Sequence, residues 1–414
     1  MSKEVSLQSL RREWAERYKK LSAAEKPHVK PCPDCGEPPY LKPVCPETGV
    51  FHERERHTIV GGEMIRSNVV ESSALMAAID RSRVRWVASR TQLVRADAVA
   101  LNLFQSFVRQ LDWTLQRYGI LYGTYDEALA TVEVHAIYEP EQHGDARAFH
   151  FEKDPRIHRV DRVAQLLGLR RVGAVCTHPA RNVEDMVLSA REMLLCTREQ
   201  SRFGDECVLL TMSPNIDTGR IECQAWQTSP QAVHFYRLGV LSESNPNNNN
   251  SNNTNNNSNT NNNSNSNSSD DPADGKYVYS SIPLEVAQQE TDEKGHMRVV
   301  TRAPSQEIDT RWFTSYVAVQ QFESPVVRNL FMRISRPGME PPTMANLRNY
   351  MEDPKRRNAT MLEKLADFHV LLFLADSIFS VEDDMPVIIG AMRKERPEED
   401  AQSYEMILRS YLEA

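Results

Sequence analysis

Two apolar segments of this chain carry side chains that bind zinc or move protons in other proteins. The first contains Glu133 and Glu139, and the second, about thirty residues later, contains Cys176 and His178 in the run Cys-Thr-His-Pro. A catalytic zinc keeps three protein ligands and one open position for water. Because His178 is the one clear ligand here, the pattern favours binding rather than hydrolysis.

Other chemistry at these residues stays open. Cys176 and His178 lie two apart on a predicted strand, so they share a face and could form a Cys–His nucleophile pair, although no third residue to orient them is apparent. Glu133 and Glu139 could act as acid or base. Without a metal to activate water, each is better read as a surface or hydrogen-bonding carboxylate, and His178 as a structural histidine.

A second cluster lies near the N-terminus, where Cys32 and Cys35 form a Cys-x-x-Cys step in a Pro-rich stretch. Such a step places two thiolates within reach of one zinc ion. The second pair of ligands stays open among His28, Cys45, His52 and His57, and the predicted structural zinc set is Cys32, Cys35, Cys45 and His52. A redox pair or two incidental thiols are the alternatives; a redox motif favours a βαβ setting that is not apparent here.

Composition limits the class of protein. The 414 residues carry a net charge of −8, which argues against a dedicated nucleic-acid binder and gives no reason to expect a membrane surface. No secretory signal is visible at the N-terminus, and the longest apolar run, Val370–Ala375, is too short to span a membrane. The seven cysteines are odd in number and irregularly spaced, which predicts reduced thiols in the cytoplasm or nucleus.

The elements that would position these residues alternate between strand and helix. Apolar periodicity predicts helices at 7–21, 96–118, 160–167 and 183–196, and strands at 119–125, 131–138, 172–177, 207–212, 220–226 and 233–240. Strands return at 276–299 and 312–321, followed by helices at 362–375, 385–392 and 404–412. This alternation predicts an α/β layer fold whose last part is mainly helical.

Asn245–Ser269 is a low-complexity tract of Asn and Ser with no apolar side chain to bury. Burial could not offset its ordering entropy, so it is predicted to be a disordered surface insertion. A prion-like assembly tract is the alternative.

Two sets of aromatic residues stand out as possible contacts. Trp113 and Tyr118, with Arg117, belong to the residue types enriched at interface hot spots, although core packing suits both aromatics equally. Phe368 and His369 lie in an apolar helix, where core packing is the simpler interpretation and a partner-facing histidine the other.

The Cys-Thr-His-Pro run resembles the metal site of MPN/JAMM-type zinc isopeptidases. That family carries His-x-His-Pro, followed by an Asp ligand eleven residues after its second His. Here Cys176 replaces the first His, and Ser189 stands where the Asp falls. The resemblance implies an inactive protease fold in which Cys176, His178 and Ser189 form a degenerate site.

Four segments together resemble the nuclear protein localization protein 4 homologues, in that family's order and near its spacing: 117–125, 134–140, 166–173 and 365–374. The resemblance runs from about residue 90 to 414, interrupted by the Asn tract. It implies an α/β fold with an inactive, MPN-type sheet-and-helix domain at 91–243. The domains on either side are an N-terminal helix and zinc finger at 1–60, a connector at 61–90, the insertion at 244–275 and a C-terminal domain at 276–414.

In function, the resemblance implies a noncatalytic adaptor. It would bind polyubiquitinated proteins and deliver them to the hexameric AAA unfoldase, valosin-containing protein, as a heterodimer with ubiquitin fusion degradation protein. Proteasomal degradation would follow, with the chain in cytoplasm and nucleus and reaching the ER or nuclear envelope through partners. The implied cofactor is a structural zinc, and the residues expected to contact ubiquitin or a partner are Trp113, Tyr122, Tyr138, Glu139, Phe368 and His369.

The chain also departs from this family. It has no room for the usual N-terminal ubiquitin-like domain, and nothing in it fits a second zinc finger, which puts docking on the unfoldase ring in doubt. Two rival functions remain: an isopeptidase with an unconventional metal set around Glu133, Cys176 and His178, and a scaffold that kept the fold and lost ubiquitin binding.

Overall fold

The structure is a computed structural model that describes residues 57–60, 63–66, 83–181, 187–244, 275–291, 297–301 and 304–413. The predicted helix at 7–21, the predicted zinc ligands Cys32, Cys35, Cys45 and His52, and the Asn tract lie outside these residues. The chain divides into two compact units: Met1–Val84 with Ile282–Ser305, and Arg85–Ser281 with Gln306–Ala414.

The described part of the first unit is built from strands. β1 (His57–Val60) pairs antiparallel with β2 (Glu63–Arg66). The far part of β13 (Tyr277–Thr291) pairs with β14 (Met297–Thr301) and, in parallel, with β3 (Arg83–Val84). An ion pair of 3.1 Å between Arg83 Nε and Glu285 Oε2 ties β3 to β13.

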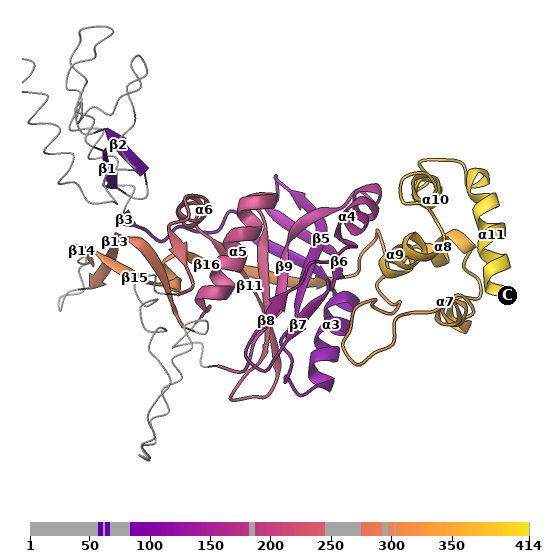
Figure 1. The fold of residues 1–414 in the computed structure, drawn as a ribbon, viewed down its shortest axis with the longest axis horizontal. Helices are drawn as coiled ribbons and strands as arrows, with labels where there is room; N and C mark the ends of the chain where they lie inside the picture. The colour runs from indigo at the N-terminus through magenta and orange to yellow at the C-terminus, as the bar shows by residue number, and fades with distance from the viewer. Residues whose placement is uncertain are drawn as a thin grey trace, which may run out of the picture. The chain divides into compact units, whose positions relative to one another are not determined.

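A closed barrel forms the centre of the second unit (Figure 1). Its strands, in spatial order, are β10 (Val208–Pro214), β11 (Ile221–Thr228), β16 (Thr314–Phe322), β4 (Leu93–Asp97), β6 (Thr131–Tyr138), β5 (Tyr118–Asp126) and β9 (Arg170–Thr177). The predicted strands at 119–125, 131–138, 172–177, 207–212 and 220–226 are confirmed. Because β16 belongs to the barrel, the predicted C-terminal domain supplies one of its strands.

Two hydrophobic clusters lie on opposite sides of the barrel strands. Alternate strand residues such as Val94, Val134 and Val175 meet one face of α3 (Ala98–Gln110). The other cluster joins residues such as Tyr122 and Ala174 to α4 (Ile157–Leu166), α5 (Ala190–Phe203) and the C-terminal helices. A β-bulge at His135 lets β6 contribute to both clusters, because Val134 faces the first and Ala136 the second.

Three predicted helices or strands need correction. The helix predicted at 96–118 ends at Gln110, because Asp112 and Trp113 take φ values of 47° and 59° and turn the chain away. The helix predicted at 183–196 is α5, which begins only after Ser189 caps it. The strand predicted at 233–240 is a helix, α6 (Pro230–Arg237), because Ser229 is its N-cap and Pro230 occupies its first turn.

Shorter elements complete the second unit. β7 (Gln142–Gly144) and β8 (Phe149–Phe151) form a hairpin. The near part of β13 pairs with β12 (Leu241–Ser242), and β15 (Ser305–Asp309) also pairs with β13. The 3₁₀ helices are η4 (Thr310–Trp312), η5 (Pro354–Arg356) and η6 (Glu398–Ala401).

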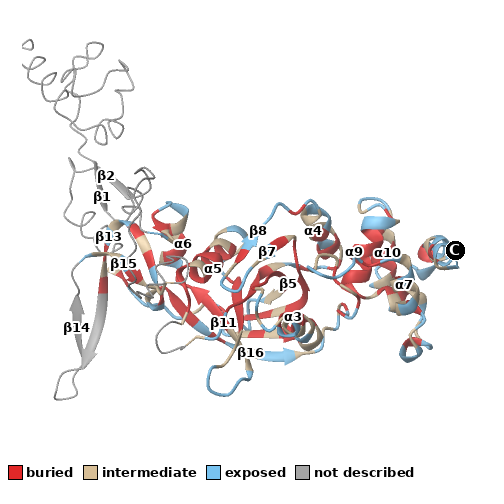
Figure 2. Cartoon of the chain, turned by 60° about the horizontal axis from the view of Figure 1, so that its bottom comes forward, coloured by how far each residue is buried: buried red, intermediate tan, exposed pale blue. Residues whose placement is uncertain are grey.

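The C-terminal part is helical, as predicted. It comprises α7 (Met344–Met351), α8 (Met361–Leu365), α9 (Phe368–Ser377), α10 (Met385–Met392) and α11 (Gln402–Glu413). The single helix predicted at 362–375 is two helices, because Asp367 leaves helical geometry to cap α9. Figure 2 shows buried residues in the barrel strands and in α9 and α10. In the part of the chain that the structure describes, no helix is long and apolar enough to cross a membrane.

Candidate functional site

The Cys-Thr-His-Pro run lies where β9 ends beside the start of α5. The backbone N–H of His178 donates to Met212 O at 3.2 Å, and the Thr177 hydroxyl accepts from Arg117 N at 2.8 Å. These bonds fix the end of β9 against its neighbours. A cavity of about 210 Å³ opens here, lined by His178, Arg181, Ser189, Glu192 and their neighbours.

Cys176 belongs to the protein core rather than to this cavity. Its side chain is fully buried among apolar residues, and it does not line the cavity. Burial, with a contribution from Glu192, raises the pKa of the thiol well above its ordinary value. Cys176 is therefore a protonated thiol, unsuited as a zinc ligand or as a nucleophile for His178.

His178 is held in one orientation. Its Nδ1 lies 2.8 Å from the carbonyl oxygen of Pro179, so Nδ1 carries a proton and donates it to that carbonyl. Burial, together with the nearby Arg181 cation, lowers the pKa of the imidazole although Glu192 opposes the shift. The ring is therefore neutral at physiological pH, with Nε2 free of that proton.

Ser189 serves the helix that follows it. Its hydroxyl accepts from Glu192 N at 3.3 Å, while the Glu192 carboxylate accepts from Ser189 N at 2.8 Å. This reciprocal pair is a capping box, which satisfies two backbone donors at the start of α5. The position of the expected metal-binding carboxylate is thus occupied by a helix cap.

Glu192 is the one carboxylate among the described residues of the cavity lining, and Arg181 neutralises it. The Arg181 guanidinium contacts both carboxylate oxygens, at 3.1 and 2.8 Å, and also donates to Val187 O. Burial alone would raise the pKa of Glu192, but Arg181, together with the backbone N–H of Ser189, outweighs burial and the pKa falls below its ordinary value. A fixed cation thus lies near His178, the one imidazole among the described lining residues, and would repel a zinc ion there.

The donor set therefore does not fit a catalytic zinc. Among the described residues of the site, a neutral imidazole, a paired carboxylate, a buried thiol and a capping hydroxyl cannot supply three ligands and an open position. Among the residues that the structure describes, no group of three His, Cys, Asp or Glu side chains could hold a metal. Sequence reasoning missed Arg181 and Glu192, although the capping-box spacing of Ser189 and Glu192 was visible.

The segment that contains this site is similar to a known protein family. Residues 117–262 match the model of the NPL4 family. The chain carries an NPL4 family domain. It is 24% identical over 304 residues to "Nuclear protein localization protein 4 homolog" of Dictyostelium discoideum, covering 73% of this chain and 44% of that protein.

Two further relatives agree. "NPL4-like protein 2" of Arabidopsis thaliana is 25% identical over 322 residues, covering 76% of this chain and 67% of that protein. "Nuclear protein localization protein 4" of Saccharomyces cerevisiae is 25% identical over 176 residues, covering 34% and 30%. The chain thus spans 44% of the Dictyostelium relative and 64% of "NPL4-like protein" of Oryza sativa subsp. japonica. The resemblance inferred from the four segments is confirmed.

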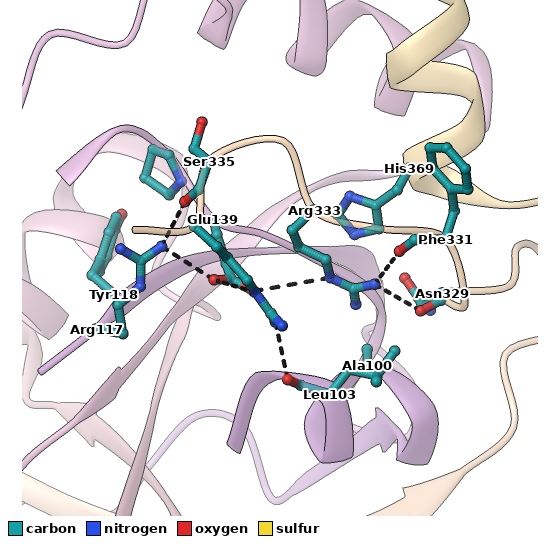
Figure 3. A network of polar contacts seen from close by, with 12 residues as sticks. Ala100, Leu103, Arg117, Tyr118, Glu139, Asn329, Phe331, Arg333, Ser335 and His369 are labelled. Carbon is teal, nitrogen blue, oxygen red and sulfur yellow. Dashed lines mark hydrogen bonds and ion pairs between the residues drawn. The ribbon is translucent and has the colours of Figure 1, made fainter. Parts of the chain in front are cut away.

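A second polar centre links the NPL4 family domain to the chain that leads to the C-terminal helices. Glu139 is buried and accepts from Arg117 Nη2 at 3.1 Å and from Arg336 Nε at 3.1 Å, with Arg333 Nε at 3.9 Å (Figure 3). Arg117 Nη2 also donates to Ser335 O at 2.9 Å. Burial would raise the pKa of Glu139, but the three arginines outweigh it and hold the pKa below its ordinary value.

Five of the six residues expected to contact ubiquitin or a partner are buried: Tyr122, Tyr138, Glu139, Phe368 and His369. The hydroxyl of Tyr122 donates to Asp161 Oδ1 at 2.7 Å and that of Tyr138 to Asp154 Oδ2 at 2.6 Å. Phe368 and His369, at the start of α9, have almost no exposed surface, and Figure 3 shows His369 beside Arg333.

The sixth, Trp113, is half-buried and lines a surface pocket. That these six residues bind a partner stays a prediction. Glu133 is placed as expected, as a hydrogen-bonding carboxylate 2.5 Å from Arg95 Nη1.

Proposed function

We propose that this chain is a noncatalytic adaptor with a degenerate MPN-type domain. In this proposal it binds polyubiquitinated proteins and delivers them to a hexameric AAA unfoldase of the valosin-containing protein type, for extraction and proteasomal degradation. Its partner would be ubiquitin fusion degradation protein. The names of the relatives refer to nuclear protein localization, which supports the nuclear part of this role. In this proposal the chain also acts in the cytoplasm and reaches the ER or nuclear envelope through partners.

The observation that carries the noncatalytic part is the Arg181–Glu192 pair. An MPN-type site that hydrolyses an isopeptide bond needs a metal-bound water. Here the Glu192 carboxylate near His178 is paired with the Arg181 guanidinium instead of being free to bind a metal. The match of residues 117–262 to the NPL4 family supports the adaptor part. In this proposal the domain keeps a surface that binds ubiquitin chains and has lost the zinc-dependent hydrolysis.

One experiment tests both parts. Purified full-length chain is incubated with polyubiquitin chains, and both capture and cleavage are measured, with and without a chelator. We expect capture with intact chains, and the same result for His178→Ala. Cleavage that the chelator stops and that His178→Ala abolishes would establish the isopeptidase instead. Intact chains without capture would favour the scaffold reading.

The unfoldase is tested separately by co-purification of the tagged chain from its own cells. We propose that Cys32 and Cys35 hold a structural zinc that supports docking on the ring. Cys32→Ser with Cys35→Ser should then remove one zinc per chain and weaken co-purification, while polyubiquitin capture is unchanged. Metal analysis that finds no zinc in the parent protein would refute this.

A further inference from the structure

The end of α3 and the turn between β10 and β11 enclose a pocket that the proposed function does not use. It has a volume of about 380 Å³ and is lined by Gln105, Arg109, Trp113, Gly219, Arg220 and Ile221. No lining residue is acidic. The two arginines therefore give the pocket a positive charge, although the whole chain carries −8.

Both arginines are available to a ligand. Arg109 and Arg220 are exposed, and among the residues that the structure describes neither guanidinium has a hydrogen-bond or ion-pair partner. Trp113 belongs to the same lining and is half-buried against the apolar cluster that contains α3. Trp and Arg are the residue types that dominate binding energy at protein interfaces.

The backbone that presents Trp113 is held in an unusual conformation. Asp112 and Trp113 both have positive φ values, 47° and 59°, a backbone conformation that residues other than Gly seldom adopt and that is strained for a side chain as large as Trp113. Two backbone bonds of α3's end maintain this shape: Asp112 N donates to Arg109 O at 3.0 Å and Trp113 N to Val108 O at 3.1 Å. These bonds hold the backbone of Trp113 against the end of α3, the helix that also carries Arg109.

The opposite wall is equally ordered. Asn215 Oδ1 accepts from Asp217 N and Thr218 N, each at 2.9 Å, and Asn215 N donates to Arg220 O at 2.8 Å. Both walls are therefore set before a ligand arrives, which lowers the entropy cost of binding.

We propose that this pocket docks an acidic peptide segment of a partner protein. One carboxylate of the segment pairs with Arg109 and Arg220, and an apolar side chain of the segment rests on Trp113. Charge and size decide the class of ligand. Two guanidinium groups attract carboxylates. Two cations in a pocket of about 380 Å³ suit a short acidic segment, whereas the extended phosphate backbone of a nucleic acid is bound by a longer run of basic side chains.

The test measures binding of labelled peptides to the full chain by fluorescence anisotropy. The probe is a Glu-rich peptide with one Phe, and its control has Gln in place of every Glu. We expect the Glu peptide to bind the parent protein at least about tenfold more tightly than the Gln peptide, because the Gln peptide cannot form charge-assisted hydrogen bonds with the two arginines. Added salt should weaken binding of the Glu peptide, because salt screens the attraction between its carboxylates and the arginines.

The double variant Arg109→Ala with Arg220→Ala should raise the Kd of the Glu peptide by about tenfold or more. The double variant Arg109→Lys with Arg220→Lys should raise this Kd by less. The matched control is Arg202→Ala with Arg409→Ala, two exposed arginines elsewhere that also lack partners among the described residues. That control should change the Kd by less than about twofold. Because ubiquitin is not used, the outcome is independent of the adaptor function.

A second readout locates the ligand. The indole N–H signal of Trp113, assigned by its disappearance in Trp113→Phe, should shift as the Glu peptide is added. No saturable binding to the parent protein, an equal loss in the control pair, or an unshifted Trp113 signal would overturn the proposal. So would an RNA oligonucleotide that binds more tightly than the peptide and is lost in the Arg109 and Arg220 double variant.

Discussion

Glu139 and Glu192 are both buried carboxylates that stay ionised because arginines surround them. For each, burial raises the pKa and guanidinium groups lower it by more. Breaking such a pair leaves uncompensated charge in the protein interior, and that cost exceeds the value of the pair itself. At Glu139 the charges left behind would be Arg117, Arg333 and Arg336.

Glu139→Gln should therefore lower the free energy of unfolding by about 3 to 5 kcal/mol at neutral pH, measured by urea denaturation. Glu127→Gln is the control, because the Glu127 side chain is 85% exposed in its ion pair with Arg90 and should have little effect.

The stabilisation that Glu139 provides should also depend on pH. Because the folded pKa of Glu139 lies below its ordinary value of 4.5, its ionised form stabilises the fold above pH 4.5, and this stabilisation is lost as pH falls from 4.5 through the folded pKa. The difference between parent and Glu139→Gln should thus shrink below pH 4.5. A constant difference across the range would show that the carboxylate charge is not what Glu139 contributes.

At the scale of elements, the N-cap residues of two helices do more than begin a helix. α5 begins at Ser189, where its capping box uses the residue that a protease would need as a ligand. α9 begins at Asp367, whose buried carboxylate serves a second segment as well as its own helix.

Ser189→Ala should destabilise the chain by about 1 kcal/mol, because the N-cap acceptor for Glu192 N is lost. Urea denaturation measures the change, and Ser403→Ala on the exposed side of α11 is the control. Polyubiquitin capture should be unaffected by either. If Ser189→Ala abolished capture at unchanged stability, Ser189 would have a role in binding rather than in capping.

Asp367→Ala should cost more than about 3 kcal/mol, because several buried donors each lose an acceptor. The carboxylate accepts from Leu330 N at 2.7 Å, Phe331 N at 3.1 Å, His369 N at 3.0 Å and Tyr350 OH at 2.9 Å. Hydrogen exchange should show faster exchange at Leu330 and Phe331 than in the parent. Tyr350→Phe, which removes one donor and leaves the carboxylate, should have a smaller effect.

At the scale of the whole molecule, the positions that flank the Asn tract lie close together. β12 pairs with β13 through Leu241 and Ser280 and through Ser242 and Tyr279, so the chain before and after the insertion runs antiparallel. A short connection can therefore join the two sides.

Replacing Asn245–Ser269 by a Gly/Ser linker of about six residues should leave the melting temperature unchanged within experimental scatter, because loop-closure entropy varies slowly with length. Calorimetry of the full chain measures this. As a control, a linker of the original length tests whether length rather than composition matters. A large drop in melting temperature with both linkers would show that the tract packs on the domain.

Local pattern alone determined much of this protein. Apolar alternation located β5, β6, β9, β10 and β11 to within a few residues, because strands with a buried face must repeat every second residue. Four short segments identified the NPL4 family, and the replacements Cys176 and Ser189 already argued against zinc hydrolysis. α6 was missed because its apolar residues suit a strand, whereas Ser229 and Pro230 start a helix.

Tertiary structure decided what depends on contacts between distant residues. Only the folded chain brings β16 into the barrel and places Arg333 and Arg336 on Glu139. Only the folded chain brings Arg109, Trp113 and Arg220 into the lining of one pocket. The physical reason is that sequence periodicity reports which face of an element is buried, but not which element covers it. Ion pairs and pockets depend on that covering element, so their residues carry no local signal in the sequence.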